Sequence, residues 1–198
     1  MKRACVFGAS ITSGKNDFKE GGWCDLLKRY LFGKGIFVYN LGVSGDDTND
    51  LLKRFDNECE ARRPDIIIFA IGGNDTQYFI NEKQFRVDIE DTIENFRELL
   101  DKAKDYTSHV IVIGLTRVDE EVINSVYIEE KGKCYKNKFL EKYDKSIEKV
   151  SSEQDVHFIP TFDVIDKSDL DDGLHPTPKG HKKLFVRIRN YIDNLDLY

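Results

Sequence analysis

The stretch RACVFGASITSG (residues 3–14) joins a short apolar segment to a turn of small residues. Residues 3–7 have the composition of a buried β-strand. Gly8 and Gly14 permit unusual backbone angles and a close approach by a ligand. A helical pattern follows, whose apolar residues share one face: Trp23, Leu26, Leu27, Tyr30 and Leu31. Strand, tight turn and helix in this order are the unit of a parallel sheet covered by helices.

The same alternation continues along the chain. Further strands are predicted at residues 36–41, 65–71, 109–114 and 156–160. Between and after them, apolar residues three and four apart predict helices around residues 51–59, 85–100, 140–150 and 184–195. No linker or repeat interrupts the pattern. We therefore expect one α/β domain over residues 1–198, a three-layer α/β/α sandwich with a five-stranded parallel sheet in the flavodoxin-like order 2-1-3-4-5.

Residues 116–133 form the one long connection without clear periodicity, and many of them are charged. Because this segment follows the fourth predicted strand, it begins at the carboxyl edge of the sheet, where doubly wound proteins bind ligands. We expect a loop there. A lid over the site and a plain surface connection are both compatible with the sequence.

The charge pattern narrows the range of partners. The formal net charge is −6 with 33% charged residues, and Lys and Arg are spread along the chain, which argues against nucleic acid. The longest apolar run, residues 66–71, is far shorter than the roughly 20 residues that span a bilayer. The first strand begins too early for a signal peptide, so we expect a cytoplasmic protein. Nothing indicates an oligomeric state.

The four cysteines give no sign of a metal or redox site. Cys5, Cys24, Cys59 and Cys134 are far apart and include no Cys-x-x-Cys pair, so we expect buried, reduced thiols and no metal. A phosphate-binding P-loop at Gly14-Lys15 is also excluded. The spacing from Gly8 to Gly14 is one residue too long, and Asn16 stands where Ser or Thr would hold magnesium.

Polar and glycine residues follow three further predicted strands. The second strand ends in NLGVSG (residues 40–45), the third in GGND (72–75), and the segment DDGLHPTP (171–178) lies beyond the fifth. In the last segment Asp172 precedes His175 by three residues, in a turn stiffened by Pro176 and Pro178. The carboxylate can therefore reach the imidazole Nδ1. Each block alone is compatible with a capped turn.

Taken together with the first turn, these blocks resemble the SGNH hydrolases, also called the GDSL esterase and lipase family. The resemblance runs from Gly8 to His175. One position departs from the family pattern, because Ala9 stands where the family usually has Asp before the serine. We expect this change to loosen the hydrogen-bond support of the first turn.

The resemblance implies a serine ester hydrolase that needs no cofactor. Ser10 would be the nucleophile, His175 the general base and Asp172 the residue that orients the histidine. The backbone N–H groups of Ser10 and Gly42 and the side-chain amide of Asn74 would form the oxyanion hole. In the expected strand order, the turns that carry these three residues emerge side by side.

The substrate would be a small ester, and no apolar stretch outside the proposed core is available to line a long-chain tunnel. We therefore expect short acyl or acetyl groups, with thioesters and lysophospholipids as alternatives within the family. A catalytically silent module that binds a sugar or acyl group, and a flavodoxin-like nucleotide-binding or signalling domain, are the competing classes of function.

Several other polar residues are not expected to take part in catalysis. His109, His157 and His181 match no family position. Asp163 and Asp166 are alternative partners for His175, and Asp75 is expected to cap a helix or brace the Asn74 turn. These residues complete the set of candidates that the sequence offers.

Overall fold

The computed structural model describes residues 1–195 and 197, and a five-stranded parallel sheet forms its centre. Its strands are β1 (Lys2–Gly8), β2 (Ile36–Gly42), β3 (Ile66–Ala70), β6 (Val110–Ile113) and β8 (His157–Ile159). They lie in the order β2-β1-β3-β6-β8, and every neighbouring pair is parallel. Counted along these five strands, this is the expected order 2-1-3-4-5.

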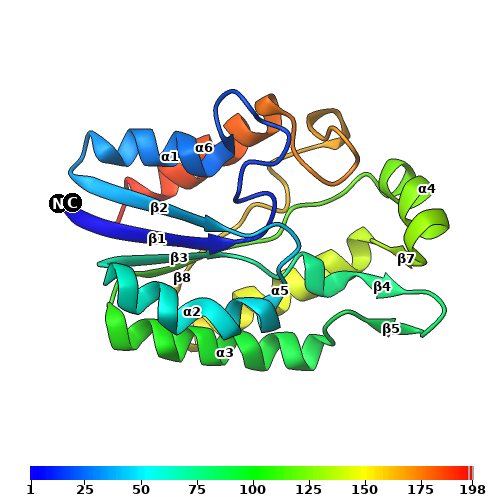
Figure 1. The fold of residues 1–198 in the computed structure, drawn as a ribbon, viewed down its shortest axis with the longest axis horizontal. Helices are drawn as coiled ribbons and strands as arrows, with labels where there is room; N and C mark the ends of the chain where they lie inside the picture. Colours follow the sequence, from blue (N-terminus) through cyan, green and yellow to red (C-terminus); the bar gives the residue numbers. More distant parts are fainter. Residues whose placement is uncertain (196, 198) are drawn as a thin grey trace.

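Helices cover both faces of the sheet (Figure 1). On one face lie α1 (Gly22–Phe32) and α6 (Pro178–Ile192), and on the other lie α2 (Thr48–Arg62), α3 (Ile89–Tyr106) and α5 (Asn137–Glu153). The three-layer sandwich is therefore confirmed. Two hydrophobic clusters follow from it, because alternate residues of β1 point to opposite faces. Cys5 and Phe7 belong to the cluster under α2, α3 and α5, whereas Ala4 and Val6 belong to the cluster under α1 and α6.

The segment expected to be a loop contains a helix. Within residues 116–133, α4 spans Glu120–Lys131, with the Asp119 side chain accepting a hydrogen bond from Glu121 N–H at its start and Gly132 in the left-handed conformation at its end. Only Ile123 of this helix is buried. An amphipathic pattern could not reveal it, because α4 has no apolar stripe facing a core.

A second, smaller sheet was also absent from the expected fold. Its two-residue antiparallel strands β4 (Tyr78–Phe79), β5 (Gln84–Phe85) and β7 (Lys133–Cys134) lie in the order β5-β4-β7. The expected helix around residues 85–100 therefore begins four residues late, at Ile89, and Phe85 belongs to β5. This sheet brings Lys133 and its neighbours against the segment that follows β3.

The four cysteines are buried and unpaired. Burial raises the pKa of the Cys5 thiol to about 12, so this thiol stays protonated at neutral pH. In the part of the chain that the structure describes, no helix is long and apolar enough to cross a membrane.

Candidate active site

Ser10 lies in the turn directly after β1, and this turn is held by hydrogen bonds from several sides. The Ser10 carbonyl accepts from the N–H of Lys15 at 3.0 Å and from the hydroxyl of Ser13 at 2.8 Å. Asn40, at the end of β2, donates its Nδ2 to the carbonyl of Thr12 at 2.9 Å. These contacts, together with the hydrogen bond from the N–H of Ser13 to the carbonyl of Ala9 at 3.0 Å, support the turn.

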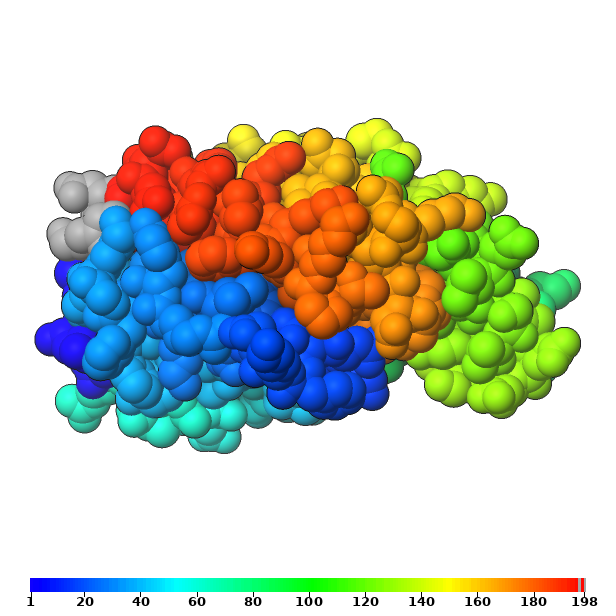
Figure 2. Space-filling view, turned by 90° about the horizontal axis from the view of Figure 1, so that it is seen from above, coloured from blue at the N-terminus to red at the C-terminus, as the bar shows by residue number. Residues whose placement is uncertain are grey.

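His175 reaches Ser10 from the far end of the chain. Its Nε2 lies 2.9 Å from the Ser10 hydroxyl oxygen, and its Nδ1 lies 2.7 Å from Oδ2 of Asp172. Figure 2 shows how the 170s segment, in orange, lies against the dark blue segment that follows β1. The structure thus brings together the two residues most distant in sequence among the predicted site residues.

The Asp172 carboxylate is also held by its own turn. Its Oδ1 accepts from the backbone N–H groups of Leu174 at 3.0 Å and His175 at 2.7 Å. Burial alone would raise the pKa of Asp172, but the hydrogen bonds and charge of His175 outweigh burial and lower the pKa below its usual value. An ionised carboxylate accepts from Nδ1–H, which leaves Nε2 of the neutral ring free to accept the serine proton.

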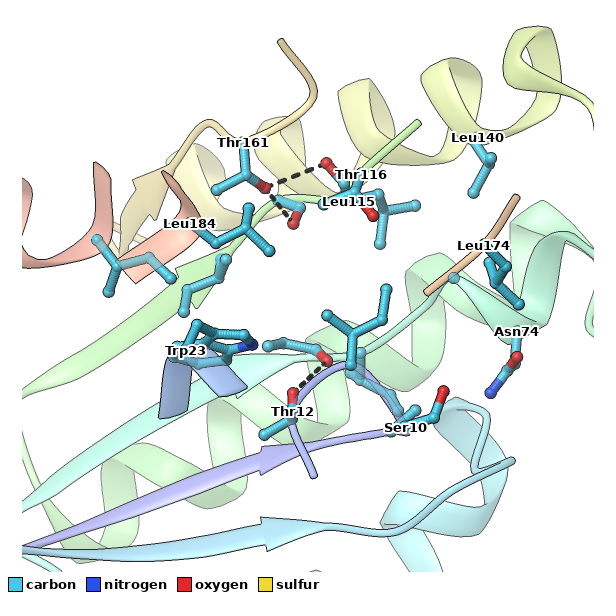
Figure 3. A pocket seen from close by; sticks show the side chains of 18 of the residues that line it. Ser10, Thr12, Trp23, Asn74, Leu115, Thr116, Leu140, Thr161, Leu174 and Leu184 are labelled. Carbon is cyan, nitrogen blue, oxygen red and sulfur yellow. Dashed lines mark hydrogen bonds between the residues drawn. The ribbon is translucent and has the colours of Figure 1, made fainter. Parts of the chain in front are cut away.

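Asn74 stands opposite Ser10, at the start of the turn after β3. Its Oδ1 accepts from the hydroxyl of Tyr135 at 2.8 Å and from Nε2 of Gln77 at 3.0 Å, while its Nδ2 donates to the carbonyl of Asp46 at 2.8 Å. These three contacts fix the orientation of the amide. Figure 3 shows the amide nitrogen on the side of Asn74 that faces Ser10. One hydrogen of the Nδ2 group remains for a ligand.

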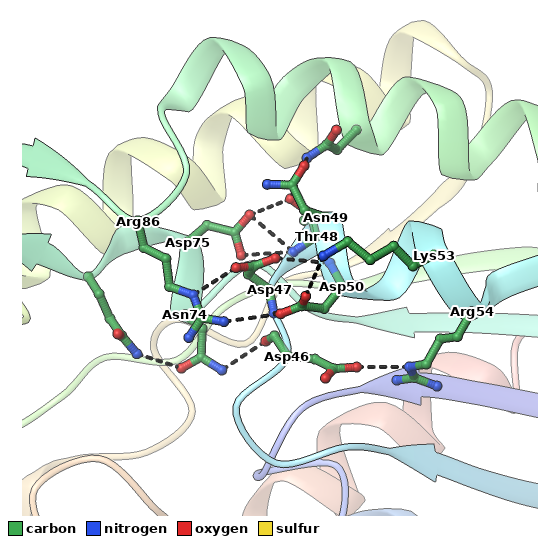
Figure 4. A network of polar contacts seen from close by, with 12 residues as sticks. Asp46, Asp47, Thr48, Asn49, Asp50, Lys53, Arg54, Asn74, Asp75 and Arg86 are labelled. Carbon is green, nitrogen blue, oxygen red and sulfur yellow. Dashed lines mark hydrogen bonds and ion pairs between the residues drawn. The ribbon is translucent and has the colours of Figure 1, made fainter.

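Two of these supporting residues have no obvious signal in the sequence. Tyr135 follows the short strand β7, which is too short to recognise, and only the tertiary fold brings its hydroxyl to Asn74. Asp46 is held in turn by Arg54, whose Nε lies 2.8 Å from Oδ2 of that aspartate (Figure 4). Gln77 could have been noticed, because it lies three residues after Asn74 in the same turn.

The structure does not place Gly42 as expected. Its N–H already donates to Oδ1 of Asn40 at 3.1 Å, and a Cβ at this position would lie 2.4 Å from the backbone nitrogen of Ser13. Gly42 therefore allows β2 to pack closely against the turn that carries Ser10, and it does not line the hollow in front of the serine.

Gly45, three residues further along, does line that hollow. Its φ of +94° suits glycine, and its N–H makes no hydrogen bond to any other described residue. The N–H of Ser10 is likewise unpaired within the described part of the chain. Gly45 thus offers the unpaired backbone donor near Ser10 that Gly42 does not.

Two pockets meet at Ser10. The inner pocket has a volume of about 80 Å³ and is mainly apolar, with Trp23, Leu115, Leu140 and Leu184 among its lining residues (Figure 3). The outer pocket opens to solvent and is lined by residues that include Ser10, Gly45, Asn74, His175, Lys15 and Lys133. Because the serine lies in the walls of both pockets, the two parts of a bound molecule can lie on either side of its hydroxyl.

His181 is a structural residue next to the site. It is fully buried on α6, and its ring joins two segments: Nδ1 accepts from the N–H of Trp23 at 3.3 Å, and Nε2 lies 2.9 Å from the carbonyl of Lys15. Burial lowers the pKa of His181, which keeps the ring neutral. The ring therefore ties the segment after Ser10 to the first helix and the last helix.

The remaining candidates are placed away from the reaction centre. Asp163 pairs with Arg187 at 3.4 Å, and Asp166 accepts hydrogen bonds from the backbone and side chain of Ser168, so neither contacts His175.

Asp75 is fully buried and accepts hydrogen bonds from Thr48 at the start of α2, with the backbone N–H at 3.3 Å (Figure 4). It braces the turn that carries Asn74, as expected. His109 directly precedes β6, and His157 is the first residue of β8. Neither histidine lines either pocket.

A doubly wound parallel sheet with serine, histidine and aspartate in hydrogen-bonded series at its carboxyl edge defines a class of α/β hydrolases. Within this class, residues 6–183 match the model of the GDSL-like lipase/acylhydrolase family. The chain belongs to that family, and the resemblance seen in the sequence is confirmed. It is therefore a hydrolase of ester bonds.

Individual relatives agree with this assignment. An arylesterase from Vibrio mimicus is 28% identical over 184 residues, which cover 90% of this chain and 82% of the relative. An acetylxylan esterase from Geobacillus stearothermophilus has a similar structure, with a TM-score of 0.76 at 20% identity over 96% of this chain and 94% of that one. Its solved variants include catalytic mutants in which a serine, an aspartate or a histidine is replaced by alanine.

An alpha/beta hydrolase from the metagenome of Lake Arreo, Spain, is also similar in structure. Its TM-score is 0.76 at 20% identity, with 98% of this chain and 96% of that one covered. At such low identity, the two structural neighbours establish the fold.

Proposed function

We propose that this protein cleaves carboxylic esters through an acyl-enzyme on Ser10. The observation that carries the proposal is the series of contacts from the Ser10 hydroxyl to His175 Nε2 at 2.9 Å and from His175 Nδ1 to Asp172 at 2.7 Å. A serine hydroxyl is a weak nucleophile at neutral pH and needs a base to take its proton as it attacks. His175 is within reach to do so, and the anionic Asp172 stabilises the imidazolium that forms.

The attack produces a tetrahedral intermediate with a negative oxygen. The proposed donors to this oxygen are the N–H of Ser10, the N–H of Gly45 and the Nδ2 group of Asn74, all of which border the outer pocket. Each has a hydrogen without a partner among the described residues. Donors that are already oriented stabilise the developing charge without reorganisation, and one of them contributes on the order of 3 kcal/mol.

Collapse of the intermediate transfers the proton from His175 to the leaving alcohol and leaves the acyl group on Ser10. Water then enters from the open outer pocket, and His175 takes one of its protons as the water oxygen attacks the acyl carbon. The second intermediate expels the serine, which regains its proton from the histidine. The cycle thus consumes one ester and one water and releases an acid and an alcohol.

The proposed substrates carry a short acyl group, such as acetyl. The inner pocket supports this choice, because about 80 Å³ with apolar walls suits a few carbon atoms and not a long chain. The structural neighbour that acts on acetylated xylan is consistent with it. The cytoplasmic location expected from the sequence also remains a proposal, supported by the four unpaired cysteines.

The decisive test is the variant Ser10→Ala, assayed with p-nitrophenyl acetate. Activity should fall to the background rate while the circular dichroism spectrum and the melting temperature stay close to those of the unsubstituted protein. Ser146→Ala serves as a control, because its hydroxyl lies on the exposed face of α5 and bonds only to the carbonyl of Lys142. Unchanged activity in Ser10→Ala would refute the proposal.

A fluorophosphonate probe separates the enzyme from a silent binding module of the same fold. Labelling requires a serine hydroxyl activated by a base, which the 2.9 Å contact to His175 supplies. Mass spectrometry should therefore find the phosphonate on Ser10 in the unsubstituted protein and in Ser146→Ala. Failure of the probe to react would favour the silent module.

A further inference from the structure

The outer pocket carries positive charge although the protein as a whole is acidic. The formal net charge is −6, yet Lys15, Arg86 and Lys133 line this pocket, and none of the residues described in its wall is Asp or Glu. Surface cations of an acidic protein usually lie among carboxylates. Three cations and no carboxylate in one concave wall favour a positive potential in front of Ser10.

Lys133 is a partly buried cation without a paired carboxylate among the described residues. Its side chain is half-buried, and its Nζ donates to the neutral Oε1 of Gln77 at 2.5 Å. No carboxylate described in the structure pairs with it. Burial, followed by the charges of Arg86 and Lys131, lowers its pKa, as expected for an ammonium group that lacks a compensating anion.

The other two cations differ in how far they are neutralised. Arg86 is engaged in ion pairs, because its Nε lies 2.7 Å from Asp47 and its Nη2 lies 3.1 Å from Asp50 (Figure 4). Neither aspartate lines the outer pocket. Lys15, in the segment after Ser10, is exposed and makes no ion pair with another described residue. Lys15 and Lys133 therefore supply the uncompensated charge, and they come from separate segments of the chain.

From this arrangement we infer that the preferred substrates are esters whose alcohol part carries a negative charge, such as a carboxylate or phosphate. The inference rests on the proposed function. The short acyl group occupies the apolar inner pocket, and the alcohol part extends through the outer pocket between Lys15 and Lys133. An acylated acidic sugar or an acylated hydroxy acid has this chemistry. The same charges attract such a substrate before it binds.

The test compares two acetyl esters with leaving groups of similar basicity, phenyl acetate and 4-acetoxybenzoate. We expect kcat/KM to be about tenfold higher for the anionic ester at low salt, because two opposite unit charges about 4 Å apart in water attract by about 1 kcal/mol. Raising NaCl from about 0.01 M to about 1 M shortens the Debye length from about 30 Å to about 3 Å and should abolish most of this preference.

The variants Lys133→Met and Lys15→Met should each reduce the ratio of the two kcat/KM values by about threefold. The ratio is the readout, because Lys133→Met also removes the hydrogen bond to Gln77 and can lower both values together. Lys149→Met is the matched control, since this lysine lies exposed on α5 and should leave the ratio unchanged. A ratio of one or less, or a ratio that neither pocket variant alters, would overturn the inference.

A binding experiment keeps this inference separate from the proposed function. In the Ser10→Ala variant, 4-hydroxybenzoate should bind more tightly than the neutral 4-hydroxybenzamide, as measured by calorimetric titration. If phenyl acetate is not hydrolysed at all, the proposed function fails and this comparison alone decides the inference. Equal binding of the two compounds would overturn it, whether or not the protein is an esterase.

Discussion

Replacing Tyr135 by Phe tests whether a residue that makes no hydrogen bond to Ser10 orients Asn74 in the proposed oxyanion hole. The Tyr135 hydroxyl donates to Oδ1 of Asn74 at 2.8 Å and accepts from Nε2 of Gln77 at 2.6 Å. The side chain is almost fully buried, so no solvent replaces the lost group. The variant therefore removes one of the two donors that fix the Asn74 amide, and leaves the amide itself in place.

The expected change in kcat is estimated from two free energies. Deleting the amide in Asn74→Ala should cost about 3 kcal/mol of transition-state stabilisation, or roughly 150-fold in kcat. Tyr135→Phe removes one neutral hydrogen bond that holds the amide, which contributes about 1 kcal/mol. We expect kcat to fall about fivefold in this variant. KM should change little, because the contact acts on the transition state more than on the bound ester.

The assay is steady-state hydrolysis of p-nitrophenyl acetate, with urea unfolding measured in parallel. Tyr143→Phe is the matched control, because the Tyr143 hydroxyl is also buried and donates to a carbonyl, that of Val87, at 2.8 Å. Both variants should lose a similar free energy of unfolding, but only Tyr135→Phe should lose kcat. If the two variants have the same kcat, Tyr135 has no role in orienting Asn74.

Three further predictions concern the charged and titratable groups. Asp172→Asn should lower kcat about ten-thousand-fold by favouring the wrong histidine tautomer, whereas Asp163→Asn should have no effect in the same ester assay. His181 has a lowered pKa in the folded state, so the unfolded chain binds more protons at mildly acidic pH. The free energy of unfolding should therefore decline as the pH falls below about 6.5, and His181→Phe should lack this decline in urea titrations. Burial raises the pKa of Asp75 to about 6, which favours the neutral form in the folded state. Its contribution to stability should thus be lost as the pH rises from about 4 to about 6, and the stability of Asp75→Asn relative to the unsubstituted protein should increase over that range.

The sheet and its covering helices were predictable because their residues are buried in regular patterns. The strands β1 and β3 read as continuous apolar runs, since helices cover both of their faces. The helices α3 and α5 have one apolar face each. In such segments the sequence period and the burial pattern have the same cause.

Helix α4 and the small sheet could not be predicted from the sequence, because their residues are not buried in a regular pattern. With Ile123 as its one buried residue, α4 shows no periodic signal, and Val122 and Val126 are instead about half exposed. Its capping residues were the available clue, because Asp119 precedes the first turn and Gly132 follows the last. Two-residue strands are too short for alternation to be recognised at all.

Some residues of the candidate site could be predicted from the sequence and others could not. Ser10, Asn74, Asp172 and His175 lie in turns at the end of predicted strands or beyond them, so their order along the chain was enough to single them out. The choice between Gly42 and Gly45 was not predictable, because it depends on which N–H is already bonded. Only the structure shows that the Asn40 side chain takes up the N–H of Gly42.

The ring of His181 also has a consequence for how the protein matures on the ribosome. The imidazole that anchors these segments is synthesised 158 residues after Trp23 and 166 residues after Lys15. The nucleophile segment therefore stays without this anchor until α6 has left the exit tunnel and docked. A chain that ends before residue 181 would contain Ser10 but would lack this anchor of the segment that follows it.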